Sequence, residues 1–202
     1  MSKIGYHLKV ITPPEDLVVS VDEVKAQARL SLPNEADPFE GAEDDTIELY
    51  IRSAIDYLCA PQGYLGRSMV TQKLQMGFDA TPDYMVKLKG APVQELLEIK
   101  YLTEDGVETV DLDDVNVEFT NDDAWVWPNG AWPRASGRPG VGRYKFIYHA
   151  GYGGPGDVPA ILRHAVVVLA ATYYRDRENS VVGMTINSIP HLANQLTNWR
   201  LW

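Results

Sequence analysis

An apolar segment near the C-terminus, residues 159–178, limits what this chain can fold into. Pro159 stands at the first turn of a helix, where its missing N–H costs nothing, so we predict a long helix that begins there. Apolar side chains occupy nearly every face of this helix: Ile161, Ala165, Val166, Val167, Leu169 and Ala170. A helix that is apolar almost all round must be buried, either in the core of its own fold or against a second subunit.

Two more helices are predicted near the N-terminus. Ser20 and Glu23 have the spacing of a capping box, which predicts a helix over about 21–30. A second helix is predicted over 44–60, because apolar residues recur there at helical spacing: Ile47, Ile51, Ala54, Ile55 and Leu58. A short C-terminal helix is predicted over about 189–199.

The middle of the chain, residues 68–149, has the period of β-strands. Asp105-Gly106 predicts a hairpin turn between two of them, because glycine tolerates a positive φ. The predicted strands are 6–11, 68–76, 84–88, 96–102, 107–112, 115–119, 124–127 and 143–149. The sequence therefore predicts an α+β fold: one domain over 1–202 with a helical core, into which a β-rich meander or small sandwich is inserted at 68–149.

The net charge of -10 is unevenly distributed along the chain. Residues 1–133 hold 25 acids and 10 bases, whereas residues 134–202 hold 3 acids and 8 bases. This balance argues against a protein that wraps around DNA, which needs a cationic face. Unlike charges on the two parts of the chain suit contacts between different surfaces. The alternative is that the acids are solvated and keep the protein soluble.

No motif predicts catalysis or a metal site. The four histidines lack metal-ligand spacing: His7, His149, His164 and His191. Cys59 is the only cysteine, so we expect a small buried side chain, no intrachain disulfide and assembly in a reducing cytoplasm. The glycine-rich stretch 151–157 lacks the Gly-Lys-Ser/Thr ending of a phosphate loop and is interpreted as a strand-to-helix connection. No apolar run reaches the ~18 residues of a membrane span, and no signal peptide is expected.

Five tryptophans are the most distinctive side chains of the sequence. Trp125 and Trp127 alternate on a predicted strand and should share one face, with Trp132 close behind. Such a group serves core packing, a protein interface or, as an alternative, a platform for sugars. Trp199 and Trp202 lie at the chain end, where we expect them to be covered by a partner.

Three blocks of the sequence resemble one protein family. They are VSVDEVKAQARLSL at 19–32, the helix and following Gly-Arg turn at 44–72, and the segment 147–178. The third block is the most specific, with Ala150-Gly151-Tyr152-Gly153 ahead of Val158-Pro159. The sequence is similar to the head–tail connector (adaptor) proteins of long-tailed phages and gene transfer agents. The β-rich middle matches only loosely.

This resemblance implies a non-enzymatic structural protein without cofactors or metals. Such adaptors form a ring, typically of twelve copies, between the capsid portal and a stopper or tail-terminator protein, and DNA passes through its channel without specific binding. The expected location is the neck of a virion or phage-like particle assembled in the bacterial cytoplasm, with no membrane contact. The runner-up function is a carbohydrate-binding or hydrolytic module that uses the tryptophan-rich strands.

The resemblance also suggests where the partners bind. Family members commonly engage the portal through a C-terminal segment. Here that segment is the tail 179–202, and its predicted portal contacts are Trp199, Arg200, Leu201 and Trp202. An acidic channel lining would keep DNA from sticking. The predicted channel residues are Asp111, Asp113 and Asp114.

Overall fold

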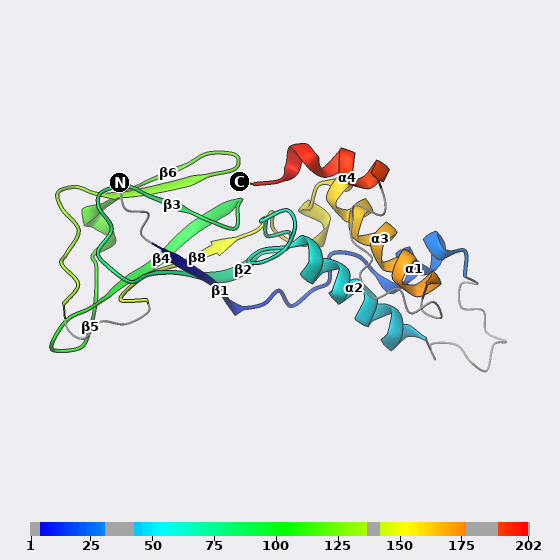
Figure 1. Ribbon diagram of the computed structural model, residues 1–202, viewed down its shortest axis with the longest axis horizontal. Helices are drawn as coiled ribbons and strands as arrows, with labels where there is room; N and C mark the ends of the chain where they lie inside the picture. The colour runs from blue at the N-terminus through cyan, green and yellow to red at the C-terminus, as the bar shows by residue number, and fades with distance from the viewer. Residues whose placement is uncertain (1–4, 31–42, 137–141, 177–189, 202) are drawn as a thin grey trace. The chain divides into compact units, whose positions relative to one another are not determined.

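The computed structural model describes residues 5–30, 43–136, 142–176 and 190–201 (Figure 1). It has the α+β fold that the sequence predicts, with helices toward both ends of the chain and antiparallel strands between them. The chain divides into two compact units. The β unit comprises Met1–Pro14 and Thr71–Tyr152, and the α unit comprises Glu15–Val70 and Gly153–Trp202.

The β unit contains two antiparallel sheets. The larger sheet has the strand order β1-β2-β8-β4-β5, with β1 at Tyr6–Thr12, β2 at Gln72–Phe78, β8 at Tyr144–Ala150, β4 at Val93–Leu102 and β5 at Val107–Thr109. The smaller sheet has the order β3-β7-β6, with β3 at Val86–Leu88, β7 at Ala124–Pro128 and β6 at Val115–Phe119. The N-terminal strand thus joins a sheet whose other strands come from the middle of the chain.

One apolar core lies between these sheets. The larger sheet contributes the aromatic side chains of Tyr144, Phe146 and Tyr148, which alternate on β8 and are fully buried. The smaller sheet contributes Val86 and Val126, which face them from the other side. Because side chains alternate across a strand, each sheet is left with a second, outward face that carries the polar residues.

The predicted hairpin is confirmed. Gly106 has φ of 139°, and the loop is closed by a hydrogen bond of 2.7 Å from the Thr103 N–H to the Gly106 carbonyl. Several strand bounds were wrong, including the start of β4, which is Val93 rather than residue 96. The strand predicted over 68–76 begins at Gln72, β3 begins at Val86 rather than 84, and β5 ends at Thr109. Asp111–Asp114 form a 3₁₀ turn instead, because the Asp111 carboxylate accepts a hydrogen bond from the Asp113 N–H.

The α unit is assembled around the long apolar helix. This helix, α3 at Ala160–Arg175, contacts α1 at Val21–Ala28, α2 at Asp44–Leu58 and α4 at Pro190–Leu196. Its buried residues lie on more than one face: Leu162, Ala165, Val166, Leu169, Ala170, Ala171, Thr172 and Tyr174. The sequence allowed this helix to be buried either in its own fold or against a second subunit. In the structure, the other helices of the α unit cover these residues.

Polar contacts fix the ends of these helices. The Ser20–Glu23 capping box is confirmed, with the Ser20 N–H donating to the Glu23 carboxylate at 2.8 Å. Glu23 also accepts a hydrogen bond of 2.6 Å from Arg163 on α3. Lys25 forms an ion pair of 2.5 Å with Asp44 on α2. Capping and interhelix ion pairs therefore use the same short stretch of α1.

Three helix ends differ from the prediction. The C-terminal helix α4 ends at Leu196, and Thr197–Trp199 form a 3₁₀ turn. α1 ends at Ala28 because Arg29 adopts a left-handed conformation, and α2 ends at Leu58 because Cys59 is extended and bridges to Arg67. The predicted end of α3 at 178 and the tail residues 179–189 lie outside the described residues. Among the helices that are described, none combines the length and apolarity needed to span a membrane.

Candidate functional site

The C-terminal segment Trp199–Leu201 is docked on a loop of its own unit. Arg67, which is only 3% exposed, donates a hydrogen bond from Nε to the Trp199 carbonyl. Its guanidinium lies 5.7 Å from the centroid of the Trp199 indole, a cation–π contact. The Leu201 N–H donates to the Leu65 carbonyl at 2.9 Å. Three of the four predicted portal residues therefore have partners in the α unit, and Trp202 lies outside the described residues.

A second cation–π contact strengthens this docking. The Arg200 guanidinium lies 4.8 Å from the ring centroid of Tyr64, which in turn stacks on Tyr57 at the end of α2. Trp199 is half-buried as a result. The sequence analysis predicted that Trp199 is covered by a partner. In the structure, residues of its own α unit cover part of the Trp199 side chain. The pairing was missed because Arg67 and Trp199 are 132 positions apart in the sequence.

The predicted channel residues come together in a single exposed turn. Asp111, Asp113 and Asp114 all lie in or next to the 3₁₀ turn before β6. Asn129 holds this turn from the neighbouring strand end, because its N–H donates to the Asp114 carbonyl at 2.8 Å and its side chain to the Asp113 carbonyl at 3.1 Å. The Asp111 carboxylate caps the turn, whereas the side chains of Asp113 and Asp114 are exposed.

The three clustered tryptophans do not form one platform. Trp125 and Trp127 share the outward face of the smaller sheet, as strand parity predicts, where they lie opposite Glu118 and Asn116 of β6. Trp132 instead enters the core, and its indole N–H donates to the Tyr84 carbonyl at 2.6 Å. Trp125 and Trp127 share a face because both belong to β7, where side chains alternate between the two faces of the sheet. Trp132 lies beyond the end of β7, so this alternation does not determine its direction.

The outward face of the larger sheet carries a group of cations that the sequence analysis missed. We call it the basic face: Lys9, Lys73, Lys100, Arg143 and Lys145. Lys100 and Lys145 occupy directly opposite positions on β4 and β8. Lys9 and Lys73 belong to the same face on β1 and β2 by strand register. These bases are scattered over 137 positions of the sequence, so only the register of β1, β2, β8 and β4 brings them together.

The glycine-rich connection after β8 is not built to hold a phosphate. The carboxylate of Asp157 takes the place that a bound phosphate would need, since it accepts a hydrogen bond of 2.8 Å from the Gly154 N–H. A Cβ on Gly153, which has φ of 128°, would meet that carboxylate at 2.4 Å. The stretch is therefore a turn closed by its own side chain, in agreement with its interpretation as a connection.

The cysteine and two of the histidines lie in surroundings that give them structural contacts. Burial raises the pKa of the Cys59 thiol to about 12, which makes the thiolate scarce at neutral pH. His7 and His149 lie 3.3 Å and 3.5 Å from the carboxylates of Asp79 and Glu95. Within the described ranges, no three His, Cys, Asp or Glu side chains are grouped closely enough to hold a metal ion.

Solved structures resemble this chain over almost its whole length. A chain from the neck of an empty gene transfer agent (GTA) particle, computed with C6 symmetry, has a TM-score of 0.75 and 24% identity, covering 97% of this chain and 96% of that one. A chain from the virion of a native GTA particle gives 0.73 and 25%, covering 96% and 95%. This chain has the fold of a gene transfer agent neck protein.

A third structure supports the same neck fold. It is a chain from the neck of a native GTA particle computed with C12 symmetry, with a TM-score of 0.63 and 20% identity over 97% of this chain and 96% of that one. No protein-family model and no curated protein sequence matches the chain. Since the likeness covers nearly all of both chains, the neck fold includes the β unit as well as the α unit.

Proposed function

We propose that this protein is a structural component of the neck of a gene transfer agent or phage-like particle. The observation that carries the proposal is the similarity to GTA neck and virion chains over at least 95% of each chain. In the proposed role, copies of the protein form an adaptor ring between the capsid portal and a stopper or tail-terminator protein, and DNA passes through the centre. The C12 symmetry of one similar neck structure supports twelve copies.

The chemistry of the described residues supports a role in assembly rather than catalysis. The ionisable side chains that the fold brings together form ion pairs, caps and exposed charged faces, and the one thiol is buried. Large aromatic and arginine side chains gather near the C-terminus, and such residues commonly anchor protein interfaces. We therefore propose a non-enzymatic protein that needs no cofactor.

We further propose that Trp199, Arg200, Leu201 and Trp202 contact the portal. The docked position of Trp199, Arg200 and Leu201 in the α unit supports an exchange of partners: the segment leaves the loop at Tyr64–Arg67 and uses its arginine and aromatic groups on the portal. Because the docked contacts must break, their strength sets a cost on portal binding.

The acidic turn before β6 is proposed to line the DNA channel. Changing Asp113 and Asp114 to Asn keeps the Asp111 cap and removes two carboxylates that repel phosphate. We expect particles with this variant to retain DNA longer, with an ejection rate lowered roughly two- to tenfold at low salt. The matched control neutralises Asp45 and Asp56 on α2. Equal ejection rates for wild type and the turn variant would contradict a channel position for these residues.

Imaging of the protein with its portal tests the proposed function. Purified protein is mixed with purified portal rings and examined by electron microscopy and native mass spectrometry. We expect a second ring of this protein stacked on the portal, even if the protein alone stays monomeric. A protein that never joins the portal but binds sugars on a glycan array, with loss of binding in Trp125→Ala, would favour the carbohydrate-binding alternative.

A further inference from the structure

The basic face is unusual within so acidic a chain. It gathers five of the 18 lysines and arginines on one side of the larger sheet, although the chain has 28 acids. Lys100 is paired with Glu98 at 2.9 Å. For Lys9, Lys73, Arg143 and Lys145, no carboxylate of the described residues lies within ion-pair distance. Among the described residues, four cations of this face therefore have no ion-pair partner.

Glu98 and Glu95 also lie on this face, where they pair with Lys100 and His149. Two details show that the positive charge around Lys100, Arg143 and Lys145 is still not fully balanced. Lys100 and Lys145 lie directly opposite each other on antiparallel strands, where like charges are destabilising. Next to them, a pocket of about 130 Å³ is lined by Lys100, Arg143 and Lys145. The Nε of Arg143 is shielded from solvent and has no hydrogen-bond acceptor among the described residues. An acidic side chain that entered this pocket would satisfy Arg143 and separate the two lysine charges.

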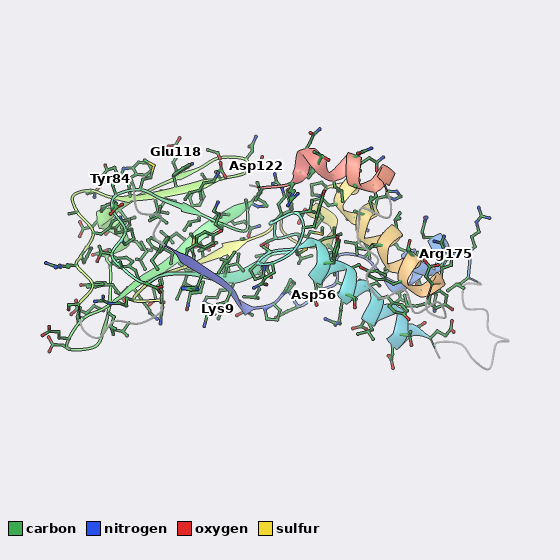
Figure 2. The ribbon with its side chains drawn as sticks, in the orientation of Figure 1. Lys9, Asp56, Tyr84, Glu118, Asp122 and Arg175 are labelled. Atoms are coloured by element: carbon green, nitrogen blue, oxygen red, sulfur yellow. The ribbon has the colours of Figure 1, made fainter. Side chains whose placement is uncertain are left out.

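The opposite side of the same β unit has the complementary chemistry. The outward face of the smaller sheet, here called the tryptophan face, carries Trp125, Trp127, Asn116 and Glu118. Its one cation, Lys87, is neutralised by Asp123 at 2.7 Å and lies 5.5 Å from the centroid of Trp125. Carboxylates and indole faces both attract lysine and arginine. Figure 2 shows Lys9 and Glu118 on opposite sides of the β unit, with Asp122 on the same side as Glu118.

We propose that the basic face of one copy packs against the tryptophan face of the next copy, in a head-to-tail contact that is repeated around a ring. This inference rests on the proposed function, since it assigns the contact between neighbouring copies. A head-to-tail ring needs two different, complementary surfaces on each copy, whereas a two-fold dimer needs one self-complementary surface. The two outward faces of one sandwich meet that need, because the shared core holds them rigidly apart.

Duplex DNA is the other polyanion that a basic face attracts. The observations favour a second copy, because a channel with a cationic wall would slow the DNA that has to pass through it. A second copy also explains why half-exposed tryptophans lie on the other side of the unit. The two occupants predict different results in the experiment below.

A charge swap tests the contact. One variant reverses the basic face with Lys73→Glu and Lys145→Glu, and a second reverses the other side with Glu118→Lys and Asp122→Lys. Either variant alone brings like charges together, and we expect the protein concentration required for ring assembly to rise roughly 10- to 100-fold. The chain with all four changes restores attraction at every contact, so its assembly should return to within about threefold of wild type.

Native mass spectrometry, with and without portal rings, measures the assembly of each variant. The control variant, Arg52→Glu with Arg175→Glu on the α unit, changes the net charge by the same amount as Lys73→Glu with Lys145→Glu. It should assemble like wild type. If wild type forms rings and both reversed variants do so too, the contact is wrong while the proposed function stands. If wild type never forms rings, both fail. If Lys73→Glu with Lys145→Glu leaves assembly intact but abolishes binding to a 30-base-pair duplex, the basic face is a DNA surface and the inference is overturned.

Discussion

Trp132→Ala is expected to lower the free energy of unfolding of the β unit by about 3–5 kcal/mol, the usual cost of removing a large aromatic side chain from a core. Trp132 is 6% exposed and packs edge-on against two aromatic rings of β8, with centroid distances of 5.8 Å to Tyr144 and 5.6 Å to Phe146. Its loss also leaves the Tyr84 carbonyl without the indole N–H that it accepts. Urea denaturation followed by circular dichroism measures the change.

Two matched variants separate the causes. Trp132→Phe keeps a ring in the core but removes the N–H donor, so its cost should be about 1–3 kcal/mol. Trp127→Ala removes the same side chain from the outward face of β7 and should cost about 1 kcal/mol or less. An equal loss for Trp132→Ala and Trp127→Ala would mean that Trp132 does not anchor the core.

Arg67→Ala is expected to release the C-terminal segment. The substitution removes the charged donor to the Trp199 carbonyl and the cation over its indole, contacts worth about 1.5–3 kcal/mol and about 0.5–2 kcal/mol. The amide of Leu201, which donates to the Leu65 carbonyl, should then exchange with deuterium at least about tenfold faster. Hydrogen exchange with mass spectrometry of the C-terminal peptide is the measurement.

The same variant tests the proposed use of this segment. If Trp199–Trp202 bind the portal after leaving the Tyr64–Arg67 loop, Arg67→Ala removes the competing docked state and should tighten portal binding. A chain truncated after Asn198 should lose that binding. Arg52→Ala, which removes an exposed arginine that pairs with Glu48 along α2, should change neither property. Full portal binding by the truncated chain would exclude the segment as a portal contact.

Local features of this fold were predictable from the sequence. The Ser20–Glu23 spacing located the start of α1, and Asp105-Gly106 located the β4–β5 hairpin, because both signals depend on residues a few positions apart. The shared face of Trp125 and Trp127 followed from strand parity alone. The ends of α1 and α2, at Ala28 and Leu58, were each predicted two residues too late, since the conformations of Arg29 and Cys59 depend on contacts that propensity does not encode.

Features that depend on distant pairing were not predictable. Alternation shows that β8 is a strand but not that it lies between β2 and β4, and the basic face exists only once that order and register are set. The sequence suggested a charge division between residues 1–133 and 134–202. The structure shows a different distribution of charge within the β unit. Lys9 and Lys145 share one face of the larger sheet, although Lys9 belongs to the acidic part of the sequence and Lys145 to the basic part.

The division of the chain into two units has a mechanical consequence. The polypeptide passes from one unit to the other three times, after Pro14, after Val70 and after Tyr152. A pull applied to either unit is therefore divided among three covalent connections rather than carried by one linker. Cleavage of any single connection leaves the units joined by the other two. Such redundancy would let the protein tolerate a nick that would sever a chain of two tandem domains.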